Sequence, residues 1–140
     1  MAESSAPLIV IGVTLAGRRP STKVLVVQRR RSESELSWQF PGGAIEPGES
    51  EQSAAERETR EETGILTEAT ERLGERVHPA TGRRIAYWQL EYVSGLPTLG
   101  DLDDLQAVKW VRASELGSLF TTDIFPSVAD ALTQRQAQTT

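Results

Sequence analysis

The sequence predicts an α/β fold, a sandwich in which a mixed sheet lies between helical layers. Two observations lead to this prediction. Apolar residues recur with a period of two in several short segments, which is typical of strands. A charged segment bounded by Ser50 and Gly64 reads instead as a helix, and two shorter helical segments follow near the C-terminus. A chain of 140 residues is long enough for one core, so we expect a single domain over 1–140.

The first half of the chain contains two predicted strands and a turn. Ile9, Ile11, Val13 and Leu15 alternate as one face of a strand. The continuous apolar run 24–27 suits a central strand that is covered on both sides. The turn is expected at 40–43, where two adjacent glycines allow unusual backbone angles and the close approach of a ligand.

The helix that follows has recognisable ends. A Pro47-Gly48 turn precedes Ser50, which is a plausible N-cap, and Gly64 is a plausible C-terminal stop. The resulting unit of strand, loop, helix and loop aims carbonyls and carboxylates at one place.

In the second half, a strand is predicted over about 84–93. It pairs through a turn at 78–82 with a strand near 73–77. Tyr87 and Trp88 lie on its opposite faces, so one is expected in the core and the other is free to stack on a base. A last strand is expected at 107–111 and helices at 113–119 and 123–133, with flexible tails at 1–6 and 134–140.

Composition excludes several kinds of partner and site. The net charge of −5 argues against a nucleic-acid polymer, although small phosphorylated molecules remain possible because an arginine or a metal ion suffices to hold them. The chain has no cysteine and only one histidine, His78, so a metal site would use oxygen ligands. The apolar run 8–15 is too short to span a bilayer, and the residues before it carry Glu3 but no Lys or Arg. We therefore expect a cytoplasmic protein with no membrane contact.

The helix places three carboxylates on one stripe. At about 100° per residue, Glu61 and Glu62 fall roughly 60° and 40° to either side of Glu58. Like charges at these spacings repel, and a divalent cation would turn that repulsion into binding. Glu51 lies almost two turns before Glu58 and Glu56 lies about 160° from it, and we expect both to be solvated carboxylates. The alternative interpretation of the whole segment is a solvated acidic helix.

The segment from Gly43 to Ile65 resembles the signature box of Nudix hydrolases. That pattern is glycine, five residues, glutamate, seven residues, Arg-Glu, an aliphatic residue, one residue, Glu-Glu, one residue, glycine and an aliphatic residue. The matching positions are Gly43, Glu49, Arg57, Glu58, Glu61, Glu62, Gly64 and Ile65. Thr59 departs from the pattern, since the family has an aliphatic residue there, but the charged positions are intact. The resemblance implies a Nudix-like α/β/α sandwich and extends over roughly 9–116.

The resemblance also implies roles for these residues. Glu58 and Glu62 would be the principal ligands of Mg²⁺, for which Mn²⁺ is a possible substitute. Glu61 would be a ligand or a supporting residue, and the carbonyl of Gly42 or Gly43 would complete the coordination. Arg57 would orient the carboxylates through Glu49 or Glu61.

The general base and the substrate contacts are less closely defined by the resemblance. Glu58 is the leading candidate for the base. The acidic run Asp101, Asp103 and Asp104 offers alternatives, with Asp104 also a candidate substrate contact, and its other interpretation is a solvated turn between strands. Arg29 ends the predicted central strand where the family often places a phosphate-contacting arginine, although three consecutive arginines are also typical of solvated charge. His78 is more typical of a turn residue than of a catalytic one.

The activity implied is Mg²⁺-dependent hydrolysis of a phosphoanhydride bond in a nucleoside triphosphate or related nucleotide, which gives a nucleoside monophosphate and pyrophosphate. An asparagine typical of enzymes acting on oxidised guanine triphosphates is missing after Phe125-Pro126. ADP-ribose or another nucleoside diphosphate derivative is the alternative substrate. A nucleotide-sensing or protein-binding module without catalysis is an alternative of a different class. Dimers are common in the family, so a homodimer is possible.

Overall fold

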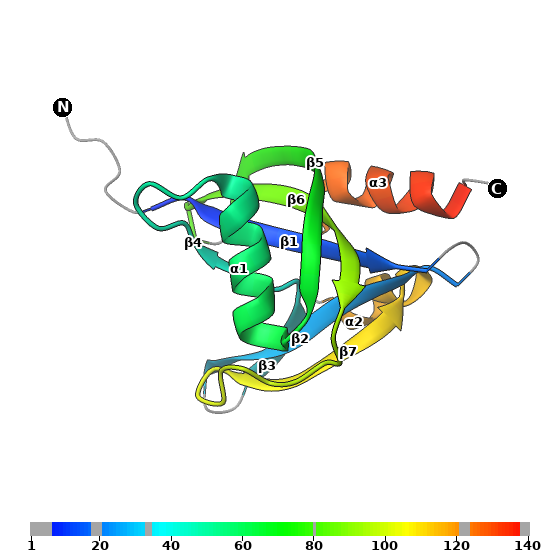
Figure 1. The fold of residues 1–140 in the computed structure, drawn as a ribbon, viewed down its shortest axis with the longest axis horizontal. Coiled ribbons are helices and arrows are strands. Elements are labelled where there is room, and N and C mark those ends of the chain that lie inside the picture. The colour runs from blue at the N-terminus through cyan, green and yellow to red at the C-terminus, as the bar shows by residue number, and fades with distance from the viewer. Residues whose placement is uncertain (1–6, 18–20, 33–34, 80, 121–123, 138–140) are drawn as a thin grey trace.

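In the described part of the chain, seven strands form one mixed sheet, and helices pack on both of its faces (Figure 1). The computed structural model describes residues 7–17, 21–32, 35–79, 81–120 and 124–137. The predicted α/β sandwich is confirmed. The strands are β1 (Ile9–Ala16), β2 (Lys23–Ser32), β3 (Glu35–Gln39), β4 (Gly42–Ala44), β5 (Leu66–Val77), β6 (Arg84–Ser94) and β7 (Leu105–Arg112). The helices are α1 (Glu51–Thr63), the 3-10 turn η1 (Ala113–Glu115), α2 (Leu116–Leu119) and α3 (Pro126–Ala137).

Strand β1 connects the two halves of the sheet. Along one edge it runs parallel to β6 from Ile9 to Leu15. Along the other edge it pairs with β4 at Ile9–Ile11 and with β2 only at Leu15–Ala16, both antiparallel. Strand β2 then pairs with β3 and β7, so the sheet order is β3-β2-β1-β6-β5 with β4 and β7 off this path. The two halves of the sheet therefore meet at one end of β1.

The core lies on both faces of the sheet. Alternating residues of β1, including Val13 and Leu15, pack toward α2 and α3, whereas Val10 packs with Ala54 toward α1. All four residues of the run 24–27 in β2 are completely buried, as predicted for a strand covered on both sides. Within the described ranges, none of the helices has the length and apolarity needed to cross a membrane.

Helix α1 begins and ends where its capping residues predict. The Ser50 side chain accepts a hydrogen bond from the Ser53 backbone N–H at 3.1 Å. Gly64 adopts a left-handed backbone with φ of 75°, and its N–H donates to the carbonyl of Arg60. Thr59 is completely buried, so the position at which the chain departs from the box pattern does face the interior.

Strands β4 and β5 differ from the prediction. Strand β5 begins at Leu66, not near residue 73, because its first half pairs with β6 although its sequence shows no apolar alternation. The expected turn at 40–43 is partly strand, since Gly42–Ala44 forms β4 against β1. Neither Gly42 nor Gly43 has a positive φ, so the prediction of unusual backbone angles was wrong.

Helix α3 also differs at both ends. It begins at Pro126, a residue favoured in the first turn because it needs no N–H partner there, and it continues to Ala137. The prediction of a flexible tail that begins at residue 134 is therefore wrong. Arg135 holds the end of the helix by an ion pair with Glu91 at 2.6 Å and a hydrogen bond to the Gly17 carbonyl at 2.9 Å. The expected tail at 1–6 lies outside the described residues.

Candidate active site

The carboxylate stripe of α1 faces a single cavity of about 390 Å³. Glu58, Glu61 and Glu62 all line it, together with Gly100 and Asp101. Helix geometry alone explains how the three glutamates come together. The two other residues come from the loop before β7, which passes the C-terminal end of α1.

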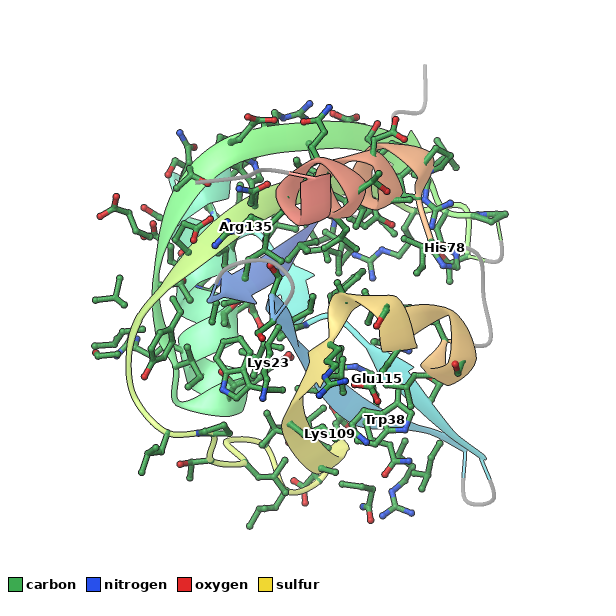
Figure 2. All side chains as sticks on the ribbon, turned by 90° about the vertical axis from the view of Figure 1, so that its right-hand side faces the viewer. Lys23, Trp38, His78, Lys109, Glu115 and Arg135 are labelled. Atoms are coloured by element: carbon green, nitrogen blue, oxygen red, sulfur yellow. The ribbon has the colours of Figure 1, made fainter. Side chains whose placement is uncertain are left out.

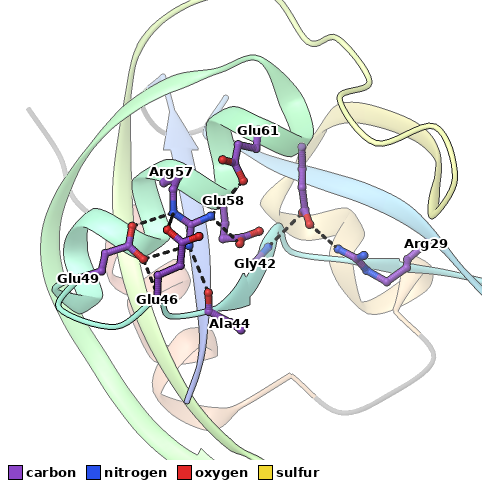
Figure 3. Close-up of polar contacts among 9 residues, drawn as sticks. Arg29, Gly42, Ala44, Glu46, Glu49, Arg57, Glu58 and Glu61 are labelled. Atoms are coloured by element: carbon purple, nitrogen blue, oxygen red, sulfur yellow. Dashed lines mark hydrogen bonds and ion pairs between the residues drawn. The ribbon is translucent and has the colours of Figure 1, made fainter. Parts of the chain in front are cut away.

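Arg57 forms hydrogen bonds with the carboxylates of Glu49, Glu58 and Glu61 (Figure 3). Its Nε and Nη2 donate to both oxygens of Glu49, at 2.7 and 3.0 Å. Its Nη1 donates to Glu58 Oε1 at 2.9 Å and to Glu61 Oε1 at 3.0 Å, and Nη2 also reaches the Ala44 carbonyl at 3.2 Å. The hydrogen bond from Arg57 lowers the pKa of Glu49, and the same bond raises the pKa of Arg57. Arg57 therefore stays charged and fixes three carboxylates from one point.

Glu62 is the most buried of the three glutamates. It is 6% exposed, accepts from Arg29 Nη2 at 2.8 Å and accepts from the Gly42 N–H at 3.2 Å. Burial raises the pKa of Glu62, and the charge and hydrogen bond of Arg29 oppose that rise. Arg29, predicted as a phosphate contact, thus lies beside the carboxylate stripe and pairs with one member of it.

Glu58 lies directly against Gly43. A Cβ atom at Gly43 would be 2.5 Å from Glu58 Oε2 and 2.8 Å from Oε1. The glycine is needed here because of close approach, not because of its backbone angles. Burial raises the pKa of Glu58, and the hydrogen bond from Arg57 opposes that rise.

The donor set fits a hard divalent cation in its chemistry. Four carboxylate side chains line the cavity, and carboxylate oxygens are what Mg²⁺ and Mn²⁺ prefer. Among the described residues, however, no group of three or more His, Cys, Asp or Glu side chains is placed to hold a metal ion. Glu58 and Glu61 each direct one oxygen to Arg57, and Glu62 directs one to Arg29.

The acidic run contributes through Asp101, not Asp104. Asp101 lines the cavity and its Oδ1 accepts from the backbone N–H groups of Asp103 and Asp104, each at 3.2 Å. Asp104 is exposed and does not line that cavity. The sequence signal for Asp101 is the glycine before it: Gly100 donates to the Glu62 carbonyl at 3.0 Å and contacts the Glu61 carbonyl so closely that a side chain would not fit.

A second, larger cavity of about 520 Å³ adjoins the carboxylates. Arg29, Gly42 and Gly43 line it on the side that contacts Glu62 and Glu58. Its walls are mainly aromatic and aliphatic side chains, among them Ile9, Ile11, Trp38, Phe40, Ile85, Tyr87, Phe120, Ile124 and Phe125. In Figure 2 two of its lining residues, Trp38 and His78, lie below and above α2. The cavity combines a wide apolar surface with an arginine at the carboxylate side.

Tyr87 and Trp88 lie on opposite faces, as predicted. Tyr87 is buried and also lines the larger cavity, with its ring centroid 4.8 Å from that of Phe125. Trp88 faces α1, where its Nε1–H donates to Glu51 at 2.9 Å. Tyr87 is therefore both a core residue and the one of the two that a ligand in the larger cavity could contact.

Glu51 and Glu56 lie off the carboxylate cavity, but they are not solvated as expected. Glu51 accepts from Arg72 Nε at 2.9 Å as well as from Trp88, and the hydrogen bond from Arg72 lowers its pKa. Glu56 accepts from the backbone N–H of Ala69 at 2.7 Å. Glu51 therefore fastens both β5 and β6 to α1, and Glu56 fastens β5.

Comparisons with known proteins agree with this geometry. A family model described as "NUDIX domain" matches residues 8–131. The "Putative nudix hydrolase 1" of Caenorhabditis elegans is 28% identical over 131 residues, which are 91% of this chain and 36% of that protein. The "RNA pyrophosphohydrolase" of Erythrobacter litoralis is 40% identical over 68 residues, 49% of this chain and 40% of that protein. The chain thus spans well under half the length of these two relatives.

Solved structures share the fold. The NUDIX domain of Shewanella oneidensis NrtR, solved in complex with ADP ribose, superposes with a TM-score of 0.73 at 19% identity. The match covers 95% of this chain and 90% of that one. At this identity the likeness shows the fold alone.

Proposed function

This chain belongs to the Nudix family, and on that premise we propose that it hydrolyses a phosphoanhydride bond of a nucleoside triphosphate or related nucleotide. The products are a nucleoside monophosphate and pyrophosphate. The observation that carries the proposal is the adjacency of the two cavities. One is lined by four carboxylates, and the other has a volume typical of small-molecule sites. Arg29, Gly42 and Gly43 lie where the two meet.

The residues that would hold Mg²⁺ are Glu58, Glu61 and Glu62, with the Gly42 carbonyl. When bound, the ion supplies charge compensation for the phosphoryl oxygens and makes water a better nucleophile at neutral pH. In this mechanism no carboxylate acts as a covalent nucleophile. Their contribution is to present oxygens on one stripe, held in place by Arg57.

Glu58 is our candidate for the general base. Arg57 holds its Oε1, while Oε2 lies over Gly43 on the side that adjoins the larger cavity. In the metal-free protein, burial raises the pKa of Glu58, which favours proton acceptance by this carboxylate. Asp101 is the second candidate, because it lines the same cavity.

Arg29 is our candidate for a phosphate contact. Its guanidinium lines the larger cavity and lies 2.8 Å from Glu62, so a phosphate chain that runs from one cavity to the other passes beside it. A planar guanidinium suits phosphate oxygens because it donates two parallel hydrogen bonds.

A nucleoside diphosphate derivative such as ADP-ribose is the second candidate substrate. The shared fold with the ADP ribose complex of NrtR favours it, since the same architecture accommodates that ligand. The intact box carboxylates argue against a module without catalysis.

The test is a nucleotide panel assayed with Mg²⁺, with Mn²⁺ and in excess EDTA, with the products separated by chromatography. We expect metal-dependent release of pyrophosphate from a triphosphate and loss of activity in EDTA. Full turnover in EDTA, or orthophosphate and a diphosphate as the main products, would contradict the proposal.

A carboxylate substitution locates the site. Glu58→Gln keeps size and helix propensity, and we expect turnover to fall at least 100-fold because it removes the base or a ligand charge. The matched control is Glu68→Gln, an exposed glutamate on β5 away from the cavity, which should keep normal turnover. Equal turnover of the two variants would place the site elsewhere.

A further inference from the structure

The wall of the larger cavity farthest from the carboxylates carries positive charge. Among the described residues that line the cavity, three are arginines, Arg29, Arg76 and Arg83, and none is Asp or Glu. Arg29 pairs with Glu62, but no ion pair with a carboxylate involves Arg76 or Arg83 within the described part of the chain. This is unexpected in a protein of net charge −5. It points to an anion that the protein does not itself supply.

The two arginines are fixed in place before any ligand arrives. The Arg76 guanidinium stacks on Tyr87 and Phe125, with Cζ 5.7 and 5.2 Å from the ring centroids, and its Nε donates to the Tyr87 hydroxyl at 3.2 Å. Arg83 donates from Nη2 to the Pro7 carbonyl at 3.1 Å. The Nε of Arg83 is buried and has no hydrogen-bond partner among the described residues. A buried donor left unpaired costs free energy, and an anionic ligand would remove that cost.

The sheet register places this charge at a definite distance from the carboxylate site. Ala44 of β4 pairs with Ile9 of β1, Ile9 pairs with Ile85 of β6, and Ile85 pairs with Arg76 of β5. Three strand spacings separate β4 from β5, which is about 14 Å. The aromatic and aliphatic walls lie between the two ends. A ligand that fills the cavity therefore meets Arg29 at one end and Arg76 and Arg83 at the other.

We propose that Arg76 and Arg83 form a second anion subsite, which binds a phosphate carried on the nucleoside, remote from the anhydride that is hydrolysed. This inference rests on the proposed function for the placement of the scissile bond, and it narrows the substrate to a nucleotide that is phosphorylated at two separate positions. Arg76 and Arg83 determine specificity and touch none of the reacting atoms.

The first test measures binding without catalysis. Adenosine and guanosine 3′,5′-bisphosphates are titrated calorimetrically against the 5′-monophosphates in the absence of metal. We expect each bisphosphate to bind the wild-type protein at least tenfold more tightly than its monophosphate, since charge-assisted hydrogen bonds are worth that much. Equal affinity for the two, or no measurable binding of either, would overturn the subsite.

Substitutions then assign the preference to the two arginines. The double change Arg76→Met and Arg83→Met keeps apolar stems for packing and should bring bisphosphate and monophosphate affinities within twofold of each other. Arg84→Met is the control, because Arg84 adjoins Arg83 in sequence but has a side chain 61% exposed and paired with Glu75. It should keep the preference. If the double variant has a lowered melting temperature, Arg76→Lys and Arg83→Lys replace it and should weaken the preference without abolishing it. An undiminished preference in either double variant overturns the assignment.

A hydrolysis assay separates this inference from the proposed function. Coenzyme A and dephospho-coenzyme A differ by one phosphate on the ribose and share the anhydride, as do NADP and NAD. We expect kcat/KM to be at least tenfold higher for the member with the extra phosphate in any pair that is hydrolysed. Hydrolysis without that preference overturns the subsite alone. Failure to hydrolyse any phosphoanhydride with Mg²⁺ overturns the proposed function, while the calorimetric result still decides the subsite.

Discussion

Gly43→Ala moves the candidate base by a distance that the structure defines. The new Cβ would lie 2.5 Å from Glu58 Oε2, whereas ordinary contact begins at 3.4 Å, so the carboxylate must retreat by about 0.9 Å. A misplacement of about 1 Å at a reacting group costs about 100-fold in rate. Because Gly43 lies in β4 without a positive φ, alanine causes no backbone strain there. We expect kcat to fall about 100-fold and the melting temperature to change by less than about 4 °C.

The assay is steady-state turnover on the best substrate of the nucleotide panel, together with thermal unfolding. Gly117→Ala is the matched control, because it adds the same methyl group where no atom lies within 4 Å apart from its chain neighbours and the backbone of its own helix. It should keep wild-type turnover. If Gly43→Ala melts normally and retains wild-type kcat, the position of Glu58 over Gly43 has no part in catalysis, and our placement of the reacting groups is wrong.

Three further predictions concern positions around the site. Thr59→Val should raise the free energy of unfolding by about 1 kcal/mol in denaturant titration, because Thr59 Oγ1 is buried without a partner among the described residues; an unchanged or lower value would contradict this. Arg57→Lys should lower kcat at least tenfold with little change in KM, since lysine cannot hold several carboxylates as a guanidinium does, and a change confined to KM would show instead that Arg57 binds substrate. Arg72 lowers the pKa of Glu51, and Arg84 together with Arg72 lowers the pKa of Glu75, so these groups add stability above the unfolded value of 4.5 that is lost as the pH falls through their lower folded pKa values. Unfolding between pH 7 and 3 should therefore be less pH-dependent in Arg72→Met than in wild type, and parallel curves would refute the linkage.

What the sequence predicts well is what depends on neighbouring residues. The ends of α1 follow from Ser50 and Gly64, because capping chemistry involves atoms a few residues apart. The three glutamates of the cavity follow from helical spacing in the same way.

What the sequence does not reveal depends on contacts between distant segments. Glu51 looks like a solvated carboxylate, but its partners Arg72 and Trp88 lie 21 and 37 residues away. The first half of β5 carries no apolar alternation, since its place is set by pairing with β6. The acidic run offers three candidates, and only the contact of Gly100 with the end of α1 singles out Asp101 among them.

The pairing of β1 has a consequence for how the chain folds as it leaves the ribosome. Ile9 pairs with Ile85 in the parallel ladder, so β1 meets its longest partner only after the 75 residues between them have been synthesised. At about 5–20 residues per second, β1 waits several seconds for β6. During that time the apolar residues of β1 lack the sheet that later covers them, and such segments are prone to aggregate. The carboxylate helix α1 lies within the intervening stretch and is available to cover one face of β1 before β6 arrives.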